Sequence, residues 1–182
     1  MNNQFSILDG KALLFRTMKE KGLTFNDVFQ KIILFMGQDP AGKYRLMLGT
    51  DSHAHGDETV FATVIVLHRK GKGAWACLRK IRHPRRYDSL HEKISMETSL
   101  TEEIASLFTE AHKMDMIDIV LPHLYKGSSF TLEGHIDIGS EQHNKTRIFI
   151  QEMVARMQSV GLEPKIKPES IAAYGVANRH TK

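Results

Sequence analysis

Three apolar runs follow one another near the middle of the chain, and only short polar stretches separate them. They span residues 44–50, 59–68 and 74–81 and are rich in β-branched and aromatic residues, which favour strands. The sequence Lys-Gly-Lys-Gly at 70–73 is typical of a hairpin turn. The pattern predicts an antiparallel meander, which restricts the fold more than any other feature of the sequence.

The chain after the meander alternates between helical and extended patterns. Apolar residues recur at helical spacing over 89–113, from 144 or 145 to 161, and over 169–180. Strand-like runs lie between them at 114–122, 130–138 and 163–167, and either of the first two could supply the fourth strand of the sheet. This order predicts an α/β fold with a mixed sheet and helices on both faces.

Residues 1–42 precede the meander and contain no candidate for chemistry. We expect a short amphipathic segment over 8–21. Thr24 and Asp27 form a T-x-x-D capping pattern ahead of periodic apolar residues, so a helix should begin behind Thr24. We therefore expect one domain of 182 residues, in which 1–42 form a helical extension packed on the rest.

The composition is ordinary for a soluble globular protein, with 41% hydrophobic and 25% charged residues. No apolar run approaches the roughly 20 residues that span a bilayer, and the first residues do not resemble a signal peptide. The single cysteine, Cys77, allows no internal disulfide. We expect a cytoplasmic protein that does not associate with membranes.

A polar cluster follows the first predicted strand. Asp51, His53, His55 and Asp57 occupy every second position after Gly49. Alternate residues of an extended chain point to one side, as metal ligands must, and open α/β sheets bind ligands where strands leave the core. The alternative is a polar turn, which these residues also favour. We assign His55 and Asp57 to that turn and keep Asp51, with His53 as an auxiliary ligand.

Two further carboxylates are candidates for the same site. Asp137 interrupts an apolar strand just before a glycine turn, where a carboxylate is costly unless it is solvated, hydrogen-bonded or bound to a cation. Glu97 lies early in the helix after the meander and could point towards the first strand. The alternatives are a turn aspartate and an exposed helix glutamate. The glutamates that compete with Glu97 are Glu92, Glu102 and Glu103.

Oxygen ligands from separate elements suit Mg²⁺ or Mn²⁺. Two such ions about 4 Å apart can activate water and stabilise the leaving oxygen in phosphodiester cleavage, whereas histidine ligands favour Mn²⁺ or Zn²⁺. Asn178 and His180, in the last predicted helix, could also reach the site, although a frayed helix end explains them equally well. The nucleotide-binding patterns GxGxxG and GxxxxGK[ST] are absent from the sequence.

The net charge of +4 is unevenly distributed, and basic residues outnumber acidic ones between positions 69 and 93. A local basic stripe is the electrostatic footprint of a nucleic-acid-binding surface. The alternative is a solvated hairpin whose lysines protect an edge strand. The candidate nucleic-acid-binding residues are Arg69, Lys70, Lys72, Arg79, Lys80, Arg82, Arg85 and Arg86.

Three motifs, taken in order, resemble the YkuK family of bacterial ribonuclease H-like proteins. They are GTDSH at 49–53, GHIDIG at 134–139, and IKPES at 166–170 leading into ANRHTK at 177–182. The resemblance implies a ribonuclease H-like fold with a mixed five-stranded sheet. It also implies acidic metal ligands at Asp51, Glu97 and Asp137, while Asn178, an amide, stands where the family pattern has a fourth carboxylate; His180 or His53 could take its place.

These observations favour a nuclease that acts on RNA, an RNA–DNA hybrid or DNA and holds Mg²⁺ or Mn²⁺ through Asp51, Glu97 and Asp137. The second hypothesis is a degraded ribonuclease H-like module that binds nucleic acid or protein, and Asn178 supports it. A third is a small-substrate metal hydrolase, because His53-Ala54-His55 resembles the H-x-H pair of amidohydrolase-type enzymes. The objection is that a TIM barrel takes about 250 residues and begins with that strand.

Overall fold

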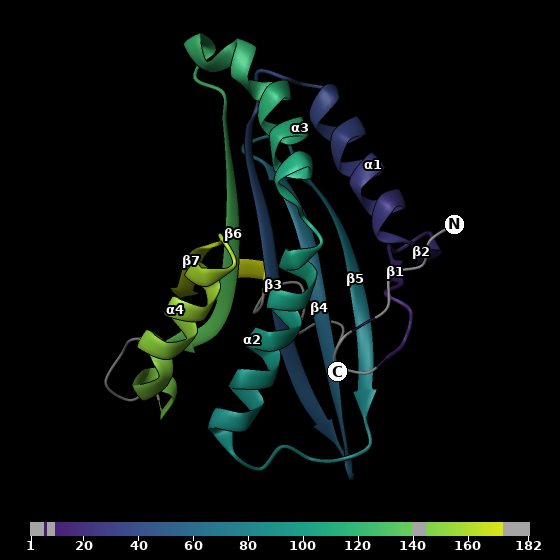
Figure 1. Cartoon of the computed structure of the whole chain (residues 1–182), viewed down its shortest axis with the longest axis vertical. Helices are drawn as coiled ribbons and strands as arrows, with labels where there is room; N and C mark the ends of the chain where they lie inside the picture. The colour runs from purple at the N-terminus through teal and green to yellow at the C-terminus, as the bar shows by residue number, and fades with distance from the viewer. Residues whose placement is uncertain (1–5, 7–9, 140–144, 173–182) are drawn as a thin grey trace.

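The structure, a computed structural model, describes Ser6, residues 10–139 and residues 145–172. Its centre is a seven-stranded mixed sheet in the order β2-β1-β5-β4-β3-β6-β7 (Figure 1). The strands are β1 (Phe15–Arg16), β2 (Lys21–Leu23), β3 (Lys43–His55), β4 (Glu58–Arg69), β5 (Ala74–His83), β6 (Ser129–Gly139) and β7 (Glu163–Lys167). The helices are α1 (Phe25–Gly37), α2 (Leu90–Ser106), α3 (Glu110–Val120), α4 (Ile150–Ser159) and two 3-10 helices, η1 (Leu121–Lys126) and η2 (Lys145–Phe149).

The predicted meander is confirmed as β3, β4 and β5, which pair antiparallel in sequence order. β6 pairs in parallel with β3, and β7 in parallel with β6. β3 is longer than predicted, because extended structure continues past Gly49 to His55 and remains paired with β4. The polar cluster therefore begins inside the strand and not after it.

The sheet has seven strands and not the predicted five, because the N-terminal segment adds β1 and β2. β1 pairs with β5 through Arg16 and Leu78 and so covers the outer edge of the meander. Leu13 and Phe15 are buried while Leu14 is exposed, which is the alternation of a strand. The expectation of a purely helical extension is therefore wrong. α1 itself begins as predicted, with Thr24 and Asp27 forming a capping box.

The stretch from Ser89 to Pro122 also differs from the prediction. The sequence predicts a single helix over 89–113 and a strand over 114–122, but two helices, α2 and α3, occupy this stretch. Thr109 caps the start of α3 through its hydroxyl. Met116 and Val120 are the buried residues of α3, and their spacing of four is helical. The apolar run resembles a strand in sequence, yet its burial follows one helix face, and β6 is the strand that pairs with β3.

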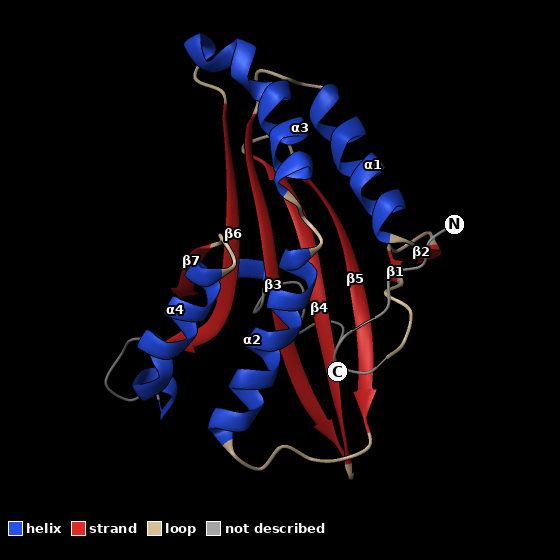
Figure 2. Ribbon diagram, in the orientation of Figure 1, coloured by secondary structure: helices blue, strands red, loops and turns tan. Residues whose placement is uncertain are grey.

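The four α-helices of the described chain cover one face of the sheet, as Figure 2 shows. Their apolar side chains and those of β3, including Leu46 and Leu48, form the main hydrophobic core. The other face of the sheet carries a smaller cluster that includes Met47, Val64 and Ala172. The helix predicted over 169–180 lies mostly outside the described residues, so the expectation of helices on both faces stays a prediction for the second face. Within the described residues, no helix is both long enough and apolar enough to span a bilayer.

Candidate functional site

Asp51 lies in β3 where β3 and β6 separate. The parallel ladder between the two strands ends at Gly49 and His135, whereas the pairing of β3 with β4 continues to the end of β3. Asp51 follows Gly49 by two residues and is only 9% exposed. It is therefore an almost buried carboxylate at the point where two parallel strands diverge, which is where open α/β sheets bind ligands.

Asp137 occupies the corresponding place in β6, two residues after His135. The ladder between β6 and β7 is irregular here, because pairing stops at His135 and Lys165 and resumes at Gly139 and Lys167. β6 therefore has extra residues at this point, and such bulges re-aim side chains. The Lys167 ammonium lies 2.8 Å from Oδ1 of Asp137. This oxygen accepts no hydrogen bond from a described residue, so the contact is one of charge.

Glu97 lies in α2 and is 8% exposed. Ser52 of β3 donates a hydrogen bond from Oγ to Oε1 of Glu97 at 2.6 Å, and Lys93 Nζ lies 3.9 Å from the same oxygen. Burial raises the pKa of Glu97 to about 8; Lys93 and Ser52 oppose this shift, and Asp51 and Asp137 add to it. Glu97 is therefore largely protonated in neutral solution and lies close enough to both aspartates to be influenced by their charge.

Asp51 and Glu97 belong to opposite faces of the sheet. Thr50 and Ser52 face α2, because Thr50 hydrogen-bonds to Thr101 at 2.8 Å and Ser52 hydrogen-bonds to Glu97. Asp51 lies between them in the strand and is directed to the other face by the alternation of strand side chains. Carboxylate oxygens are suitable ligands for Mg²⁺ or Mn²⁺. However, the described residues contain no group of three or more His, Cys, Asp or Glu arranged to hold a metal ion.

His53 and His55 are exposed near the tip of the β3–β4 hairpin. Their ring centroids are 5.0 Å apart, because extended structure continues through this stretch. His55 is the last residue of β3, so its assignment to the turn is wrong; Gly56 and Asp57 make the turn. The other two proposed ligands, Asn178 and His180, lie outside the described residues.

Another buried acidic residue, Glu133 of β6, was not identified from the sequence. Arg45 binds it through two hydrogen bonds of 2.8 and 2.7 Å, and Thr131 and His135 each donate one at 2.9 Å. The backbone N–H of Ala172 donates to Nδ1 of His135 at 3.1 Å, so the His135 proton is on Nε2, which faces Glu133. The signal in the sequence was a glutamate inside an apolar strand, two positions before a histidine.

The hydrogen bonds around Glu133 determine its charge state. Burial by itself would raise the pKa of Glu133, but hydrogen bonds from His135, Arg45 and Thr131 outweigh burial and hold the pKa below its usual range. Glu133 is therefore a satisfied carboxylate that joins β3, β6 and the segment at Ala172. This arrangement is that of a structural network rather than of a reactive group.

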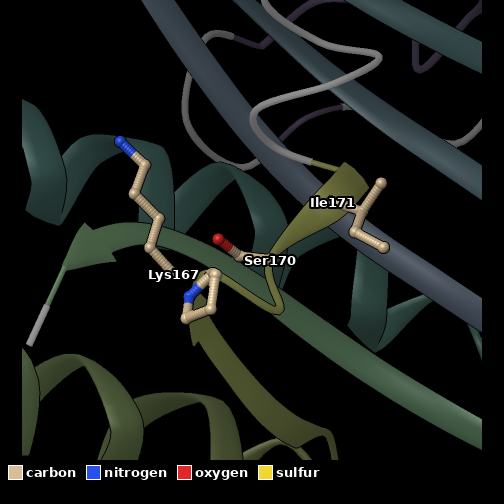
Figure 3. Close-up of a pocket in the computed structure, with 4 residues that line it drawn as sticks. Lys167, Ser170 and Ile171 are labelled. Atoms are coloured by element: carbon tan, nitrogen blue, oxygen red, sulfur yellow. The ribbon is translucent and has the colours of Figure 1, made fainter.

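A pocket of about 420 Å³ lies directly after β7 and is lined by Lys167, Pro168, Ser170 and Ile171. Figure 3 shows the Ser170 hydroxyl pointing towards the Lys167 side chain, with Ile171 on the opposite side of the segment. Ser170 is 1% exposed, and its Oγ has no hydrogen-bond partner among the described residues. Ser170 is therefore a buried polar residue in the wall of this pocket.

The predicted basic residues divide between the two ends of the β4–β5 hairpin. Arg69, Lys70 and Lys72 lie at its turn, roughly 23 Å along the sheet from Asp51 at about 3.3 Å per residue. Asp39 lies 2.8 Å from the Lys72 ammonium and 3.9 Å from the Arg69 guanidinium. The charge of this group is therefore partly neutralised.

The second group lies at the same end of the sheet as the candidate site. Ala62 pairs with both Asp51 and Lys80, so these two residues occupy one row on one face of the sheet. The Arg85 guanidinium lies 4.1 Å from the ring centroid of Tyr87, an aromatic residue to which a nucleic-acid base could also stack. The exposed basic residues of this group are Lys80, Arg82, Arg85 and Arg86. Acidic side chains lie 3.3 Å from Arg82, 2.7 Å from Arg85 and 3.8 Å from Arg86, so the charge of this group is also partly neutralised.

Arg79 is the exception among the predicted basic residues. It is one position from Lys80 in β5 and so faces α2, where its guanidinium donates a 2.8 Å hydrogen bond to Glu103. Ser6 donates a further hydrogen bond of 2.7 Å to the same carboxylate. Both side chains of the ion pair are 5% exposed, so Arg79 cannot contribute to an exposed basic surface.

A family model described as ribonuclease H-like matches residues 27–182. The chain belongs to the ribonuclease H-like family. It is similar to the uncharacterized protein YkuK of Bacillus subtilis (strain 168), with 43% identity over 171 residues that cover 94% of this chain and 98% of YkuK. The resemblance to the YkuK family is therefore confirmed. No solved structure matches the chain.

Membership of the ribonuclease H-like family agrees with the mixed sheet in which β3, β4 and β5 precede α2 and β6. It supports a role connected with nucleic acid, either as a nuclease-like protein or as a binding module. The same fold can host several functions, so a specific activity has to be argued from the residues of the site.

Proposed function

We propose that this ribonuclease H-like protein hydrolyses phosphodiester bonds of nucleic acid with the help of Mg²⁺ or Mn²⁺. The observation that carries the proposal is the repetition of one design in two parallel strands. The last pair of the ladder between β3 and β6 is Gly49 and His135, and each strand has an aspartate two residues further on. These aspartates are Asp51 in β3 and Asp137 in β6. The pKa of a buried glutamate, Glu97, responds to the charge of both. Titratable groups perturbed in this way cluster at functional sites.

In the proposed site, Asp51 and Asp137 supply oxygen ligands and Glu97 supplies a carboxyl group that exchanges a proton. An ion held by these residues would supply Lewis-acid chemistry, that is, polarisation of the phosphate and activation of an attacking water. Approach of a cation favours the ionised form of Glu97, so binding should release a proton to solvent. The exposed basic residues at this end of the sheet, Lys80, Arg82, Arg85 and Arg86, would contact backbone phosphates.

The test is hydrolysis of labelled RNA, RNA–DNA hybrid and single-stranded DNA with Mg²⁺ or Mn²⁺, comparing wild type with Asp51→Asn and Asp57→Asn. Asp57 is a matched control, because it is an exposed aspartate in the hairpin turn close by. We expect Asp51→Asn to lower the rate by roughly 100-fold or more, the scale of losing one charge-stabilising group, and Asp57→Asn to leave it unchanged. A wild-type rate no higher than that of Asp51→Asn would refute the proposal.

A second candidate is a module that binds nucleic acid without cleaving it. Two observations favour it: Lys167 lies against Asp137, and the described residues contain no arranged group of three metal ligands. The logarithm of the affinity should then fall with the logarithm of the salt concentration, with a slope of about 0.9 for each duplex phosphate that a basic side chain neutralises. We expect Arg86→Ala to reduce this slope and Lys72→Ala, at the far end of the hairpin, to leave it unchanged. A slope near zero in the wild type would exclude nucleic-acid binding.

The small-substrate hydrolase built on His53 and His55 is not favoured. Both residues are exposed on a hairpin, and the sheet is open and mixed rather than a closed barrel of parallel strands.

A further inference from the structure

Lys167 is a positive charge that the chain itself brings to Asp137. It is the last residue of β7, it pairs in register with Gly139 of β6, and its ammonium lies 2.8 Å from Oδ1 of Asp137. The bulge in β6 makes this contact possible, because Lys167 is opposite Gly139 although Lys165 is opposite His135. The two strands therefore hold the lysine and the aspartate together.

The neighbouring Lys165 shows that this contact is specific to Lys167. Lys165 carries the same charge on the same strand, but its ammonium lies 2.6 Å from Glu163 and 3.7 Å from Glu169. The Lys167 side chain is 41% exposed and lines the pocket that follows β7. Only one of the two lysines of β7 is therefore directed to the proposed metal site.

A cation beside a carboxylate reduces the attraction of that carboxylate for a second cation. Sites with two metal ions need carboxylates that approach both ions at about 4 Å separation. At Asp137, a divalent ion would have to displace Lys167 or share the carboxylate with it, and like charges at such short distances repel strongly in a partly buried site. This repulsion between Lys167 and a divalent ion arises at Asp137. It requires no contact between Lys167 and Asp51, which lies on the neighbouring strand.

We propose that Lys167 is a positioning residue that serves as the resident counterion of Asp137 and limits the site to a single divalent ion. This inference rests on the proposed function, since it assumes that Asp51 and Asp137 bind a cation. The Lys167 ammonium thereby takes the place of one of the two cations of a two-metal site.

The test is a titration of the full-length protein with Mn²⁺ at fixed pH, in the absence of nucleic acid, with free Mn²⁺ followed by electron paramagnetic resonance. The wild type should bind one ion. Lys167→Met should bind a second ion, or bind the first at least about tenfold more tightly, because a like charge has been removed from within a few ångströms. Lys165→Met is the matched control and should behave as the wild type, as should Lys167→Arg, which keeps the charge.

Equal stoichiometry and affinity for the wild type and Lys167→Met would overturn the inference, as would a wild type that binds two ions or none. Circular dichroism checks that Lys167→Met is folded; if it is not, Lys167→Gln takes its place, and the wild-type stoichiometry still decides. The proposed function can fail separately. If Mn²⁺ binding responds to Lys167 but nucleic acid is not hydrolysed, the nuclease proposal is refuted and the counterion role of Lys167 stands. If nucleic acid is hydrolysed but Mn²⁺ binding is the same in wild type and Lys167→Met, the counterion role is refuted and the nuclease proposal stands.

Discussion

Glu97 and Glu133 are both almost completely buried, with exposed fractions of 8% and 3%, yet their pKa values move in opposite directions. Glu133 has four hydrogen bonds of 2.7–2.9 Å from Arg45, Thr131 and His135. Glu97 has one such bond, from Ser52, while Lys93 remains 3.9 Å away. Burial dominates where donors are few and is overcome where they are many.

The difference separates a structural carboxylate from one available for chemistry. The hydrogen-bond donors of Glu133 come from three residues on two neighbouring strands. These donors compensate its negative charge, so Glu133 is poorly suited to bind a cation or exchange a proton. Glu97 lies near two other carboxylates and retains a proton that an arriving cation can displace. A buried acid is therefore a candidate for function when its surroundings leave its charge uncompensated, and not simply because it is buried.

The largest effect in this comparison is expected from Glu133→Gln. The substitution leaves Arg45 and His135 without their carboxylate, and unfolding free energy should fall by about 3 kcal/mol at pH 7, the lower end for a broken buried ion pair, because Arg45 is one-third exposed. Urea denaturation measures this change in unfolding free energy. The control is Glu163→Gln, which removes a surface ion pair with Lys165 and should change stability by less than about 0.5 kcal/mol.

The pH dependence of this effect has a definite sign. The folded pKa of Glu133 lies below its ordinary value of 4.5, so its stabilising contribution is present above pH 4.5 and is lost as the pH falls towards the folded pKa. The stability difference between wild type and Glu133→Gln should therefore narrow in acid. A difference that stays constant from pH 7 to pH 3 would contradict the assignment.

Glu97→Gln should act in the opposite direction and more weakly. Between pH 4.5 and about 8, the unfolded wild type releases the Glu97 proton while the folded protein keeps it, so wild-type stability falls as the pH rises and levels off above pH 8. Glutamine removes this dependence. At pH 9 the variant should be more stable than the wild type by at least about 1.4 kcal/mol, the equivalent of one pKa unit. Thermal melting of both proteins from pH 4.5 to pH 9 measures this difference. Parallel stability profiles of wild type and Glu97→Gln would show that Glu97 ionises normally.

The smallest effects should come from the neutral donors. Ser52→Ala removes the hydrogen bond that favours ionised Glu97, so the pKa of Glu97 should rise further. Thr131→Val removes one donor from Glu133, so that pKa should rise towards its ordinary value, in both cases by less than about one unit. Carbon-13 NMR titration of the side-chain carboxyl groups measures both, and a fall in either pKa would reverse the argument.

The sequence predicted those parts of the fold that depend on local pattern. The three strands of the meander, the capping box at Thr24 and the strand containing Asp137 were found because strand alternation, β-branched residues and caps act over a few neighbouring residues. The errors have a common cause. The apolar run at 117–121 and the segment around Phe15 are short, and such runs take helix or strand form according to what they pack against.

The sequence also identified Asp51, Glu97 and Asp137 as candidates, and their roles stay predictions. Residue types and positions suffice to propose these three, because a carboxylate that interrupts an apolar pattern needs a partner. The partners themselves could not be predicted. Lys167 is far from Asp137 in sequence, and the two side chains meet because β6 bulges. The sequence predicted Arg79 to be a surface residue, but its position in β5 directs it towards α2 and Glu103.

The amino-acid sequence by itself determined the meander, the alternation that follows it and the acidic residues that lie at strand ends, because hydrophobic periodicity and turn chemistry are local properties. Tertiary structure alone decided which charges are compensated. The register between β3 and β6 placed Asp51 and Asp137 each two residues beyond the last pair of the ladder, and the arrangement of donors around Glu133 and Glu97 set one pKa low and the other high. Electrostatic free energy depends on distance and burial in the folded chain, and neither is a property of a residue's neighbours in sequence.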